Sequence, residues 1–129
     1  MQNAMVKGHT ISPTPNPIED RTVRSALRAL DRKLRERFGR RYVRLILFGS
    51  RARGDYEPDS DADVAVVFRG EVDNRWSLRR LIIQDTYPIL LETGLYIQAW
   101  PVEERELDDP GKSSNPALLR NVVREGVLV

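Results

Sequence analysis

The sequence contains no cysteine and only one histidine, His9, and these absences exclude several kinds of site. Without cysteine, neither a disulfide nor a thiolate metal site can form. No hydrophobic run approaches the roughly 20 residues of a membrane-spanning helix. The first ten residues lack the apolar centre of a secretory signal. We therefore expect a cytoplasmic protein without a membrane segment, and nothing near His9 would hold it for catalysis.

Aromatic residues are also scarce, at 7% of the chain, and they form no platform interleaved with the arginines of residues 17–38, which surround the predicted helix. Proteins that bind single-stranded nucleic acid stack bases on such aromatics, so a nucleic-acid-binding helix is the least favoured interpretation. Charge, by contrast, is abundant and uneven. Residues 1–53 carry 13 Lys and Arg against 4 Asp and Glu, whereas residues 54–129 carry 8 against 15. A solvated basic helix would explain the excess of Lys and Arg in residues 1–53, and so would a face that attracts anions. Charge alone does not choose between these two interpretations.

A chain of 129 residues is long enough for one domain with one modest core. Residues 1–15 contain two prolines and show no periodicity, which predicts a mobile arm before a single domain over residues 16–129. Asn16-Pro17 is typical of a helix start, and apolar residues at spacings of three and four predict a helix over 17–38, ended by Gly39. Asn115-Pro116 predicts a second such start, with the last helix ended by Gly126.

A further helix is predicted between Asp73 or Asn74, as its cap, and Thr93-Gly94. Its apolar residues suggest a stripe about as good as that of the first helix. Pro88 lies inside it and removes one backbone donor, so a kink or break is expected near residues 84–87. The apolar members of the predicted stripe are Trp76, Leu78, Leu81, Ile82, Ile83, Tyr87, Leu90 and Leu91.

Three β-rich runs are predicted as strands: Tyr42–Phe48, Asp61–Phe68 and Leu95–Trp100, the last stopped by Pro101. Residues 103–115 are acidic and rich in turn formers, which favours a surface loop. The order of elements is therefore helix, strand, strand, helix, strand, helix. Because helices and strands are mixed without strict alternation, we expect an α+β fold with a small mixed β-sheet flanked by helices.

The stretch from Leu45 to Phe68 carries the chemistry of this sequence. After the first apolar strand, Gly49 lets the backbone approach a ligand. Ser50 can cap a helical turn that runs through Arg53 and directs free N–H groups at a phosphate. Asp61 and Asp63 are two residues apart, so on a strand both carboxylates project from the same face. A turn of phosphate size beside paired carboxylates is what a metal–nucleotide site requires.

Gly49-Ser50, Ala52-Arg53-Gly54 and Ser60-Asp61-Ala62-Asp63-Val64 together resemble the signature of nucleotidyltransferases of the DNA polymerase β superfamily. The likeness is greatest to the minimal members, which are often paired with a helical toxin protein. The two spaced elements cover about a fifth of the chain, and their joint occurrence is far more specific than either alone. The resemblance implies a small mixed sheet with helices packed on one side.

The resemblance also implies roles for individual residues. Asp61 and Asp63 would be catalytic and would hold one or two Mg²⁺ ions, while Gly49 and Ser50 would bind the β and γ phosphates of ATP or another nucleoside triphosphate. Ser60, Arg51 and Arg53 complete the candidate nucleotide-binding set. For Arg53 a structural role comes first, tying the turn to Asp55 or Asp63, which leaves Arg51 as the better phosphate ligand. In a purely structural alternative, Ser60-Asp61 is a turn cap and Asp63 an exposed strand residue.

One position departs from the family pattern. Fully active members carry a third Asp or Glu on the strand beside the paired acids, and here Gln98 stands at that place. An amide brings no negative charge to a metal and cannot act as a general base. Glu92 and Glu103 flank this strand and are candidates to substitute for the acid. With glutamine at this position we still expect nucleotide and metal binding, but catalytic turnover is called into question.

Two functions of different classes therefore stay open. In the first, the protein is a Mg²⁺-dependent nucleotidyltransferase that moves AMP from ATP to a hydroxyl of a protein or an RNA. In the second, it is an antitoxin-like or regulatory nucleotide-binding module that docks on a helical toxin partner with little or no turnover. The nucleotide base, the acceptor and the formation of a homo-oligomer are not decided by the sequence.

Overall fold

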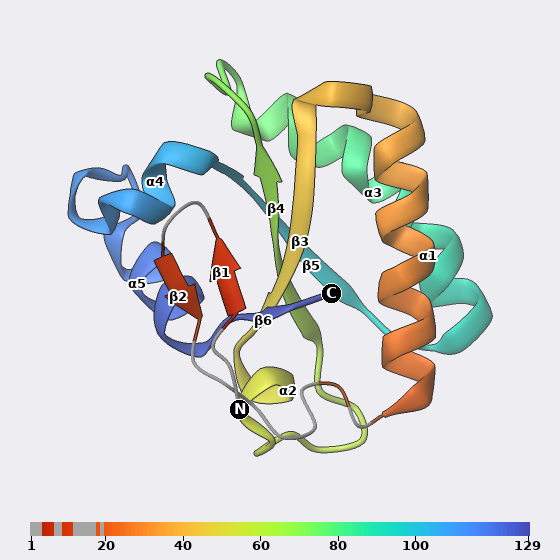
Figure 1. The fold of residues 1–129 in the computed structure, drawn as a ribbon. Helices are drawn as coiled ribbons and strands as arrows, with labels where there is room; N and C mark the ends of the chain where they lie inside the picture. The colour runs from red at the N-terminus through yellow and green to blue at the C-terminus, as the bar shows by residue number, and fades with distance from the viewer. Residues whose placement is uncertain (1–3, 7–8, 12–17, 19) are drawn as a thin grey trace.

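The computed structural model describes residues 4–6, 9–11, 18 and 20–129. Within this part, four strands form a mixed sheet in the order β5-β4-β3-β6, and β1 and β2 form a separate antiparallel pair (Figure 1). The strands are β1 Ala4–Val6, β2 His9–Ile11, β3 Tyr42–Phe48, β4 Ala62–Phe68, β5 Ile97–Glu103 and β6 Val127–Leu128. The helices are α1 Arg21–Phe38, α2 Ser50–Arg53, α3 Arg75–Thr93, α4 Glu104–Asp108 and α5 Pro116–Glu125, with 3₁₀ turns η1 Gly39–Arg41 and η2 Pro110–Lys112. The predicted α+β class with a small mixed sheet is confirmed.

The sheet separates two apolar layers. β3 pairs antiparallel with β4 and β6, while β4 and β5 are parallel and are connected by α3. Because side chains alternate along each strand, one face packs against α1 and α3 and the other against α4 and α5 (Figure 1). Helices thus cover both faces, which differs from the one-sided packing that the resemblance implied. The face towards α4 and α5 also carries the candidate site.

The prediction for β3 is confirmed residue for residue, and the predicted caps Gly39, Asn74, Gly94 and Asn115 cap their helices. The start of α1 was predicted too early. The helix begins at Arg21 because the Asp20 carboxylate accepts hydrogen bonds from the amides of Thr22 (2.9 Å) and Val23 (3.2 Å). The predicted cap, Asn16-Pro17, lies outside the described residues.

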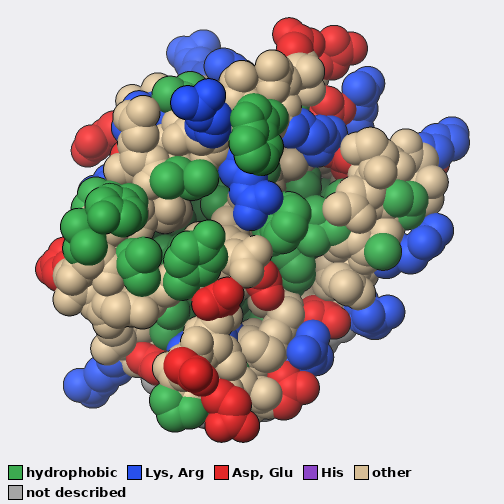
Figure 2. Space-filling model, turned by 180° about the vertical axis from the view of Figure 1, so that it is seen from behind, with side chains coloured by type: hydrophobic (Ala, Val, Ile, Leu, Met, Phe, Trp, Pro, Cys, Tyr) green, Lys and Arg blue, Asp and Glu red, His purple; other side chains and the backbone are tan. Residues whose placement is uncertain are grey.

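Helix α3 differs from its prediction in two ways. It continues past Pro88 without a break, because Gln84 and Pro88 lie on the exposed side, where water can reach the carbonyl that proline leaves unpaired. Its apolar residues also surround the helix instead of forming one buried stripe. Leu78, Ile82 and Ile89 are buried, whereas several large apolar side chains face solvent, with Trp76 71% and Leu91 69% exposed. Figure 2 shows hydrophobic side chains gathered on the rear surface of the molecule.

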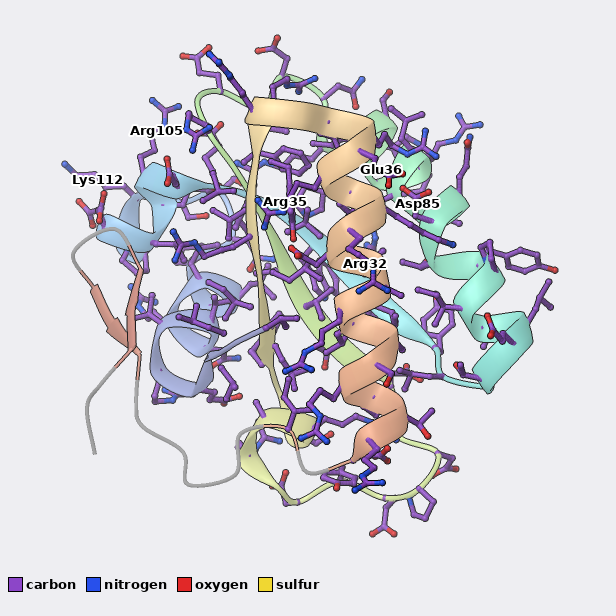
Figure 3. All side chains as sticks on the ribbon, turned by 45° about the vertical axis from the view of Figure 1, so that its right-hand side comes forward. Arg32, Arg35, Glu36, Asp85, Arg105 and Lys112 are labelled. Atoms are coloured by element: carbon purple, nitrogen blue, oxygen red, sulfur yellow. The ribbon has the colours of Figure 1, made fainter. Side chains whose placement is uncertain are left out.

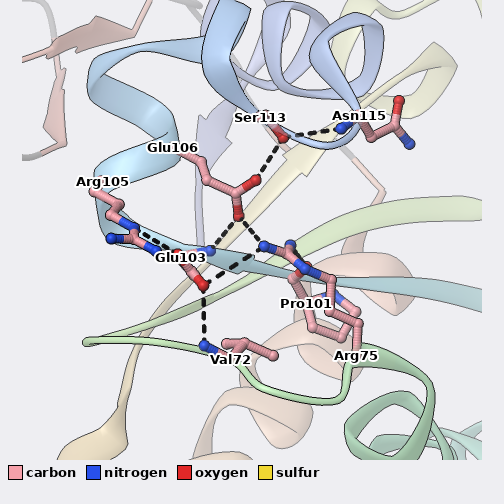
Figure 4. Close-up of polar contacts among 8 residues, drawn as sticks. All are labelled: Val72, Arg75, Pro101, Glu103, Arg105, Glu106, Ser113 and Asn115. Atoms are coloured by element: carbon pink, nitrogen blue, oxygen red, sulfur yellow. Dashed lines mark hydrogen bonds and ion pairs between the residues drawn. The ribbon is translucent and has the colours of Figure 1, made fainter.

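The segment that follows α3, from Ile97 to Lys112, also differs from the sequence prediction. Strand β5 continues through Pro101, which is tolerated because β5 is an edge strand and needs no donor on its open side. The acidic stretch predicted as a surface loop instead ends β5 and forms α4 and η2. Glu103 and Glu106 are buried there and bind the Arg75 guanidinium, so their charges are satisfied inside the protein (Figure 4).

The N-terminal segment, residues 1–15, was predicted as a mobile arm. Residues 4–6 and 9–11 of it form the strands β1 and β2, and the other residues of 1–15 lie outside the described part. The mobility of the segment stays a prediction. None of the helices in the described part is both long and apolar enough to cross a membrane.

Helix α1 carries most of the basic excess of the first half of the chain. Figure 3 shows Arg32, Arg35 and Glu36 at different positions around this helix, with Asp85 of α3 nearby. The Arg37 guanidinium binds the Asp85 carboxylate in a bidentate ion pair, with N–O distances of 2.8 and 3.0 Å. The arginines of α1 therefore lie on several sides of the helix, and Arg37 contacts α3. They do not form a single nucleic-acid-binding face.

Candidate nucleotide and metal site

The turn after β3 has the geometry that the motif predicts. Gly49 adopts φ +77°, and α2 follows directly, with the amides of Ala52 and Arg53 each 3.0 Å from the Gly49 carbonyl. Gly54, at φ +93°, ends the helical turn. Ser50 is the first residue of α2 and not its cap, since Gly49 holds the cap position. Among the described residues the Ser50 hydroxyl has no hydrogen-bond partner, so it is available to a ligand.

Asp63 lies directly against this turn. Its position in β4 is opposite Phe48 of β3, the residue before Gly49. A Cβ added to Gly49 would lie 2.7 Å from the Asp63 Oδ2 atom, closer than any ordinary contact. Only glycine allows the backbone and the carboxylate to approach in this way. The turn and the acid, which are 14 residues apart in sequence, therefore form one site.

The electrostatic surroundings of Asp63 leave its charge poorly compensated. Burial raises the pKa of Asp63, and the neighbouring carboxylates of Asp61 and Glu125 raise it further. The Trp100 indole and the Arg53 guanidinium oppose this shift. A half-buried carboxylate with two acidic neighbours is stabilised by a cation, and an oxygen-only donor set suits Mg²⁺.

Gln98 lies beside the paired acids, on the neighbouring strand β5. In the parallel pairing of β4 and β5 it stands opposite Asp63, and its Nε2 donates a 3.0 Å hydrogen bond to the Asp61 Oδ2 atom. Its amide thus orients one of the paired acids and adds no charge. Neither candidate replacement is near: Glu92 lies on the exposed surface of α3, and Glu103 is at the far end of β5, bound to the Val72 amide.

Arg51, the first of the two arginines of the turn, makes its contacts within the loop before β4. Arg51 is buried, and its guanidinium donates to the carbonyls of Ser60 (2.9 Å) and Pro58 (3.2 Å) while it stacks on Tyr56. Arg51 therefore holds the loop before β4 in place. The Ser60 hydroxyl accepts from the Glu57 amide at 2.8 Å, again within the loop. Neither side chain points to the paired acids in this arrangement, which gives no support to their predicted phosphate contacts.

Arg53, in contrast, faces the site. It binds Asp55 at 3.2 Å, as the structural interpretation expected, and Glu125 at 2.8 Å, while 45% of its side chain stays exposed. The sequence analysis missed Glu125, whose Oε2 atom also accepts from the Gly49 amide at 3.0 Å. The sequence held one indication that Glu125 has a special role. It is the last residue of a predicted helix, where a negative charge interacts unfavourably with the helix dipole.

The arrangement supplies two carboxylates, a positive guanidinium and unpaired donors in one place. Among the described residues, no group of three or more acidic or histidine side chains is positioned to enclose a metal ion. Asp61 and Asp63 would thus hold Mg²⁺ incompletely, which suits an ion that takes its other ligands from phosphate and water. This donor set fits a metal–polyphosphate complex better than a structural metal.

Gly49→Ala is expected to unfold at a lower denaturant concentration than Gly54→Ala. Both substitutions force alanine into a positive φ, but only at Gly49 does the new methyl group meet another residue, Asp63. The contact should add about 1 kcal/mol or more to the loss of stability. Urea unfolding followed by circular dichroism measures this difference. Equal losses for the two variants would contradict the close approach of turn and acid.

Comparison with known proteins identifies the family of this chain. A family model described as "Nucleotidyltransferase domain" matches residues 27–125, which include the turn and both acids. The chain is 37% identical over 108 residues to the "Putative protein adenylyltransferase" of Methanocaldococcus jannaschii, covering 84% of this chain and 94% of that protein. A crystal structure of a "putative nucleotidyltransferase" from Sulfolobus solfataricus aligns with 83% of this chain and 84% of its own, at 23% identity and a TM-score of 0.46. The extent of the family match and the identity to the Methanocaldococcus protein show that this chain belongs to the nucleotidyltransferase domain family.

Proposed function

We propose that the protein is a Mg²⁺-dependent nucleotidyltransferase that transfers AMP from ATP to a hydroxyl group of a protein or an RNA. The single observation that carries this proposal is the contact between the Gly49 backbone and the Asp63 carboxylate, because it joins a phosphate-sized turn to paired acids. The name of the Methanocaldococcus relative supports AMP as the group and protein as the acceptor. The proposal places the reaction in the cytoplasm.

In the proposed reaction the acceptor hydroxyl loses its proton to water and its oxygen attacks the α-phosphorus. The bond from the α-phosphorus to the oxygen that bridges it to the β-phosphate breaks, and pyrophosphate leaves. Bound Mg²⁺ would neutralise the phosphates and stabilise the attacking and leaving oxygens. Asp61 and Asp63 would hold the metal, with Gln98 fixing the orientation of Asp61. The Ser50 hydroxyl and the amides of Gly49 and Ser50 would bind the β and γ phosphates.

The test is incubation with ATP labelled on the α-phosphate, using whole-cell protein and RNA from the source organism as acceptors. Label is expected in a protein or RNA fraction when Mg²⁺ is present, and its transfer should stop when EDTA is added. Label from γ-labelled ATP should not be transferred, because the γ-phosphate leaves with pyrophosphate. Transfer of the γ label, or transfer that EDTA leaves unchanged, would contradict the proposed reaction.

A second function, docking on a helical partner with little or no turnover, is favoured by the surface of α3. Residues Ile83 and Tyr87 are 49% and 54% exposed, and Tyr96 beside them is 47% exposed. Together with Trp76 and Leu91, they form an apolar surface along the outer side of the helix. Large exposed apolar surfaces on a small protein commonly mark interaction sites. An antitoxin-like role with a helical toxin partner would use this surface and would leave the nucleotide site free.

The second function predicts a complex with a small helical protein encoded beside this gene. Ile83→Asp should abolish that complex in light scattering after co-expression, because it places a charge in the apolar surface. Gln84→Asp, an exposed neighbour with the same added charge, should leave it intact. A complex that survives Ile83→Asp would show that the partner binds elsewhere. A doubled mass of the protein alone would identify a homo-oligomer instead.

A further inference from the structure

The Glu125 carboxylate occupies two donors of the candidate site. Its Oε2 atom accepts from the Gly49 amide at 3.0 Å and from the Arg53 Nη1 atom at 2.8 Å. One oxygen thus bridges a backbone N–H and a guanidinium, the two kinds of donor that bind phosphate oxygens. The Glu125 side chain is only 10% exposed, so this contact is largely shielded from water.

This position is electrostatically unfavourable for a carboxylate in two respects. Glu125 is the last residue of α5, where the exposed carbonyl groups already carry partial negative charge. It also lies near the Asp63 carboxylate, which carries the same charge. The ion pairs with Arg53 at 2.8 Å and Arg124 at 3.5 Å compensate in part, and Arg53 is shared with Asp55 at 3.2 Å. Two carboxylates therefore share the Arg53 guanidinium.

The main chain at Glu125 is held in place by the close packing of the residue that follows it. A Cβ on the next residue, Gly126, would clash with the Val122 carbonyl and lie 2.6 Å from the Ile46 Cγ2 atom, so the chain packs directly on β3. Strand β6 then pairs with β3, with Val127 opposite Leu47. Any change in the contact must come from rotation of the Glu125 side chain.

We infer that Glu125 competes with the terminal phosphates of the nucleotide for the Gly49 amide and the Arg53 guanidinium, and that it holds these donors until a polyphosphate displaces it. The inference rests on the proposed function, because the ligand class is the triphosphate of the nucleotide. A phosphate oxygen presents the same acceptor chemistry as the carboxylate and carries more charge. When Glu125 rotates away, Arg53 can bind the phosphate instead.

Calorimetry with sodium tripolyphosphate in metal-free buffer tests this competition without requiring transfer. Glu125→Gln removes the competing charge and should bind tripolyphosphate about tenfold more tightly than the wild type. Arg53→Gln should bind it more weakly than the wild type, since it removes a phosphate donor. Glu92→Gln is the matched control: it makes the same charge change on the exposed surface of α3 and should bind like the wild type.

The results separate this inference from the proposed function. Equal or weaker tripolyphosphate binding by Glu125→Gln would overturn the inference, because it would show that Glu125 does not compete with phosphate. A loss of transfer by Glu125→Gln with unchanged tripolyphosphate binding would also overturn it, assigning Glu125 to the metal or the acceptor. The proposed function is judged independently, by Mg²⁺-dependent transfer of the α-phosphate label in the wild type.

Discussion

Asp63→Asn is expected to lower the rate of nucleotidyl transfer about 1,000-fold, because it removes a carboxylate ligand of the proposed metal ion. Asparagine keeps the size of the side chain and its place against Gly49, so the variant should fold. Asp61→Asn should have an effect of the same order. Each rate is measured with α-labelled ATP at saturating Mg²⁺, and circular dichroism verifies the fold.

The matched control for these variants is Asp59→Asn, an exposed residue of the same loop. It makes the same chemical change two residues before Asp61 and should keep the wild-type rate.

The stability of metal-free protein gives a second readout for Asp63→Asn. Since the pKa of Asp63 is raised in the folded state, its ionisation costs stability as the pH rises through that pKa. Near neutral pH, Asp63→Asn should therefore melt no lower than the wild type when metal is absent. Rates within threefold of the wild type would exclude Asp63 as a metal ligand in catalysis.

Arg75→Ala is expected to destabilise the protein by about 3 kcal/mol, because it leaves the buried Glu106 carboxylate without its cation, whereas Glu103 keeps its ion pair with Arg105. Arg75 contacts the Glu106 Oε1 atom at 2.7 Å, the Glu103 Oε2 atom at 3.7 Å and the Pro101 carbonyl at 2.9 Å (Figure 4). The side chains of Glu103 and Glu106 are each 7% exposed. Urea unfolding at pH 7 measures the loss. Arg80→Ala, on an exposed part of the same helix, is the control and should cost less than 1 kcal/mol.

The loss caused by Arg75→Ala should depend on pH in a defined direction. Burial alone would raise the pKa of Glu106, but hydrogen bonds from the Glu103 amide, Ser113 and Arg75 outweigh it and lower the pKa. A lowered pKa contributes stability above the unfolded-state value, and that stability disappears as the pH falls through the folded-state value. The difference between wild type and Arg75→Ala should therefore shrink as the pH is lowered. A difference that stays constant or grows would contradict the role of Arg75 as the counter-charge of Glu106.

The parts of this fold that local chemistry determines were predictable from the sequence. The strand over Tyr42–Phe48 and the caps at Asn74 and Asn115 follow from residues adjacent to one another. The pairing of the Gly49 turn with Asp63 was predictable because one short connection joins the two strands that carry them. In each case the residues concerned are near in sequence, so pattern and propensity act together.

The errors arose where distant residues decide the outcome. Glu106 looks solvent-exposed in sequence, but Arg75 makes its burial possible from 31 residues away. Glu125 reaches the turn from the C-terminal helix, more than seventy residues from Gly49. Arg51 and Arg53 are two apart on a helical turn and so point in different directions, and only the surrounding loop shows which is buried. The apolar residues of α3 exceed what the core can cover, which no periodicity alone reveals.

Calorimetry of ATP binding with and without Mg²⁺ tests the central claim most directly. We predict that the wild type binds ATP clearly more tightly when Mg²⁺ is present. In the double variant Asp61→Asn/Asp63→Asn, Mg²⁺ should make little difference. ATP binding that is equally tight with and without Mg²⁺, or that keeps its full Mg²⁺ dependence in the double variant, would contradict the claim that these two acids and the Gly49 turn bind one metal–nucleotide complex.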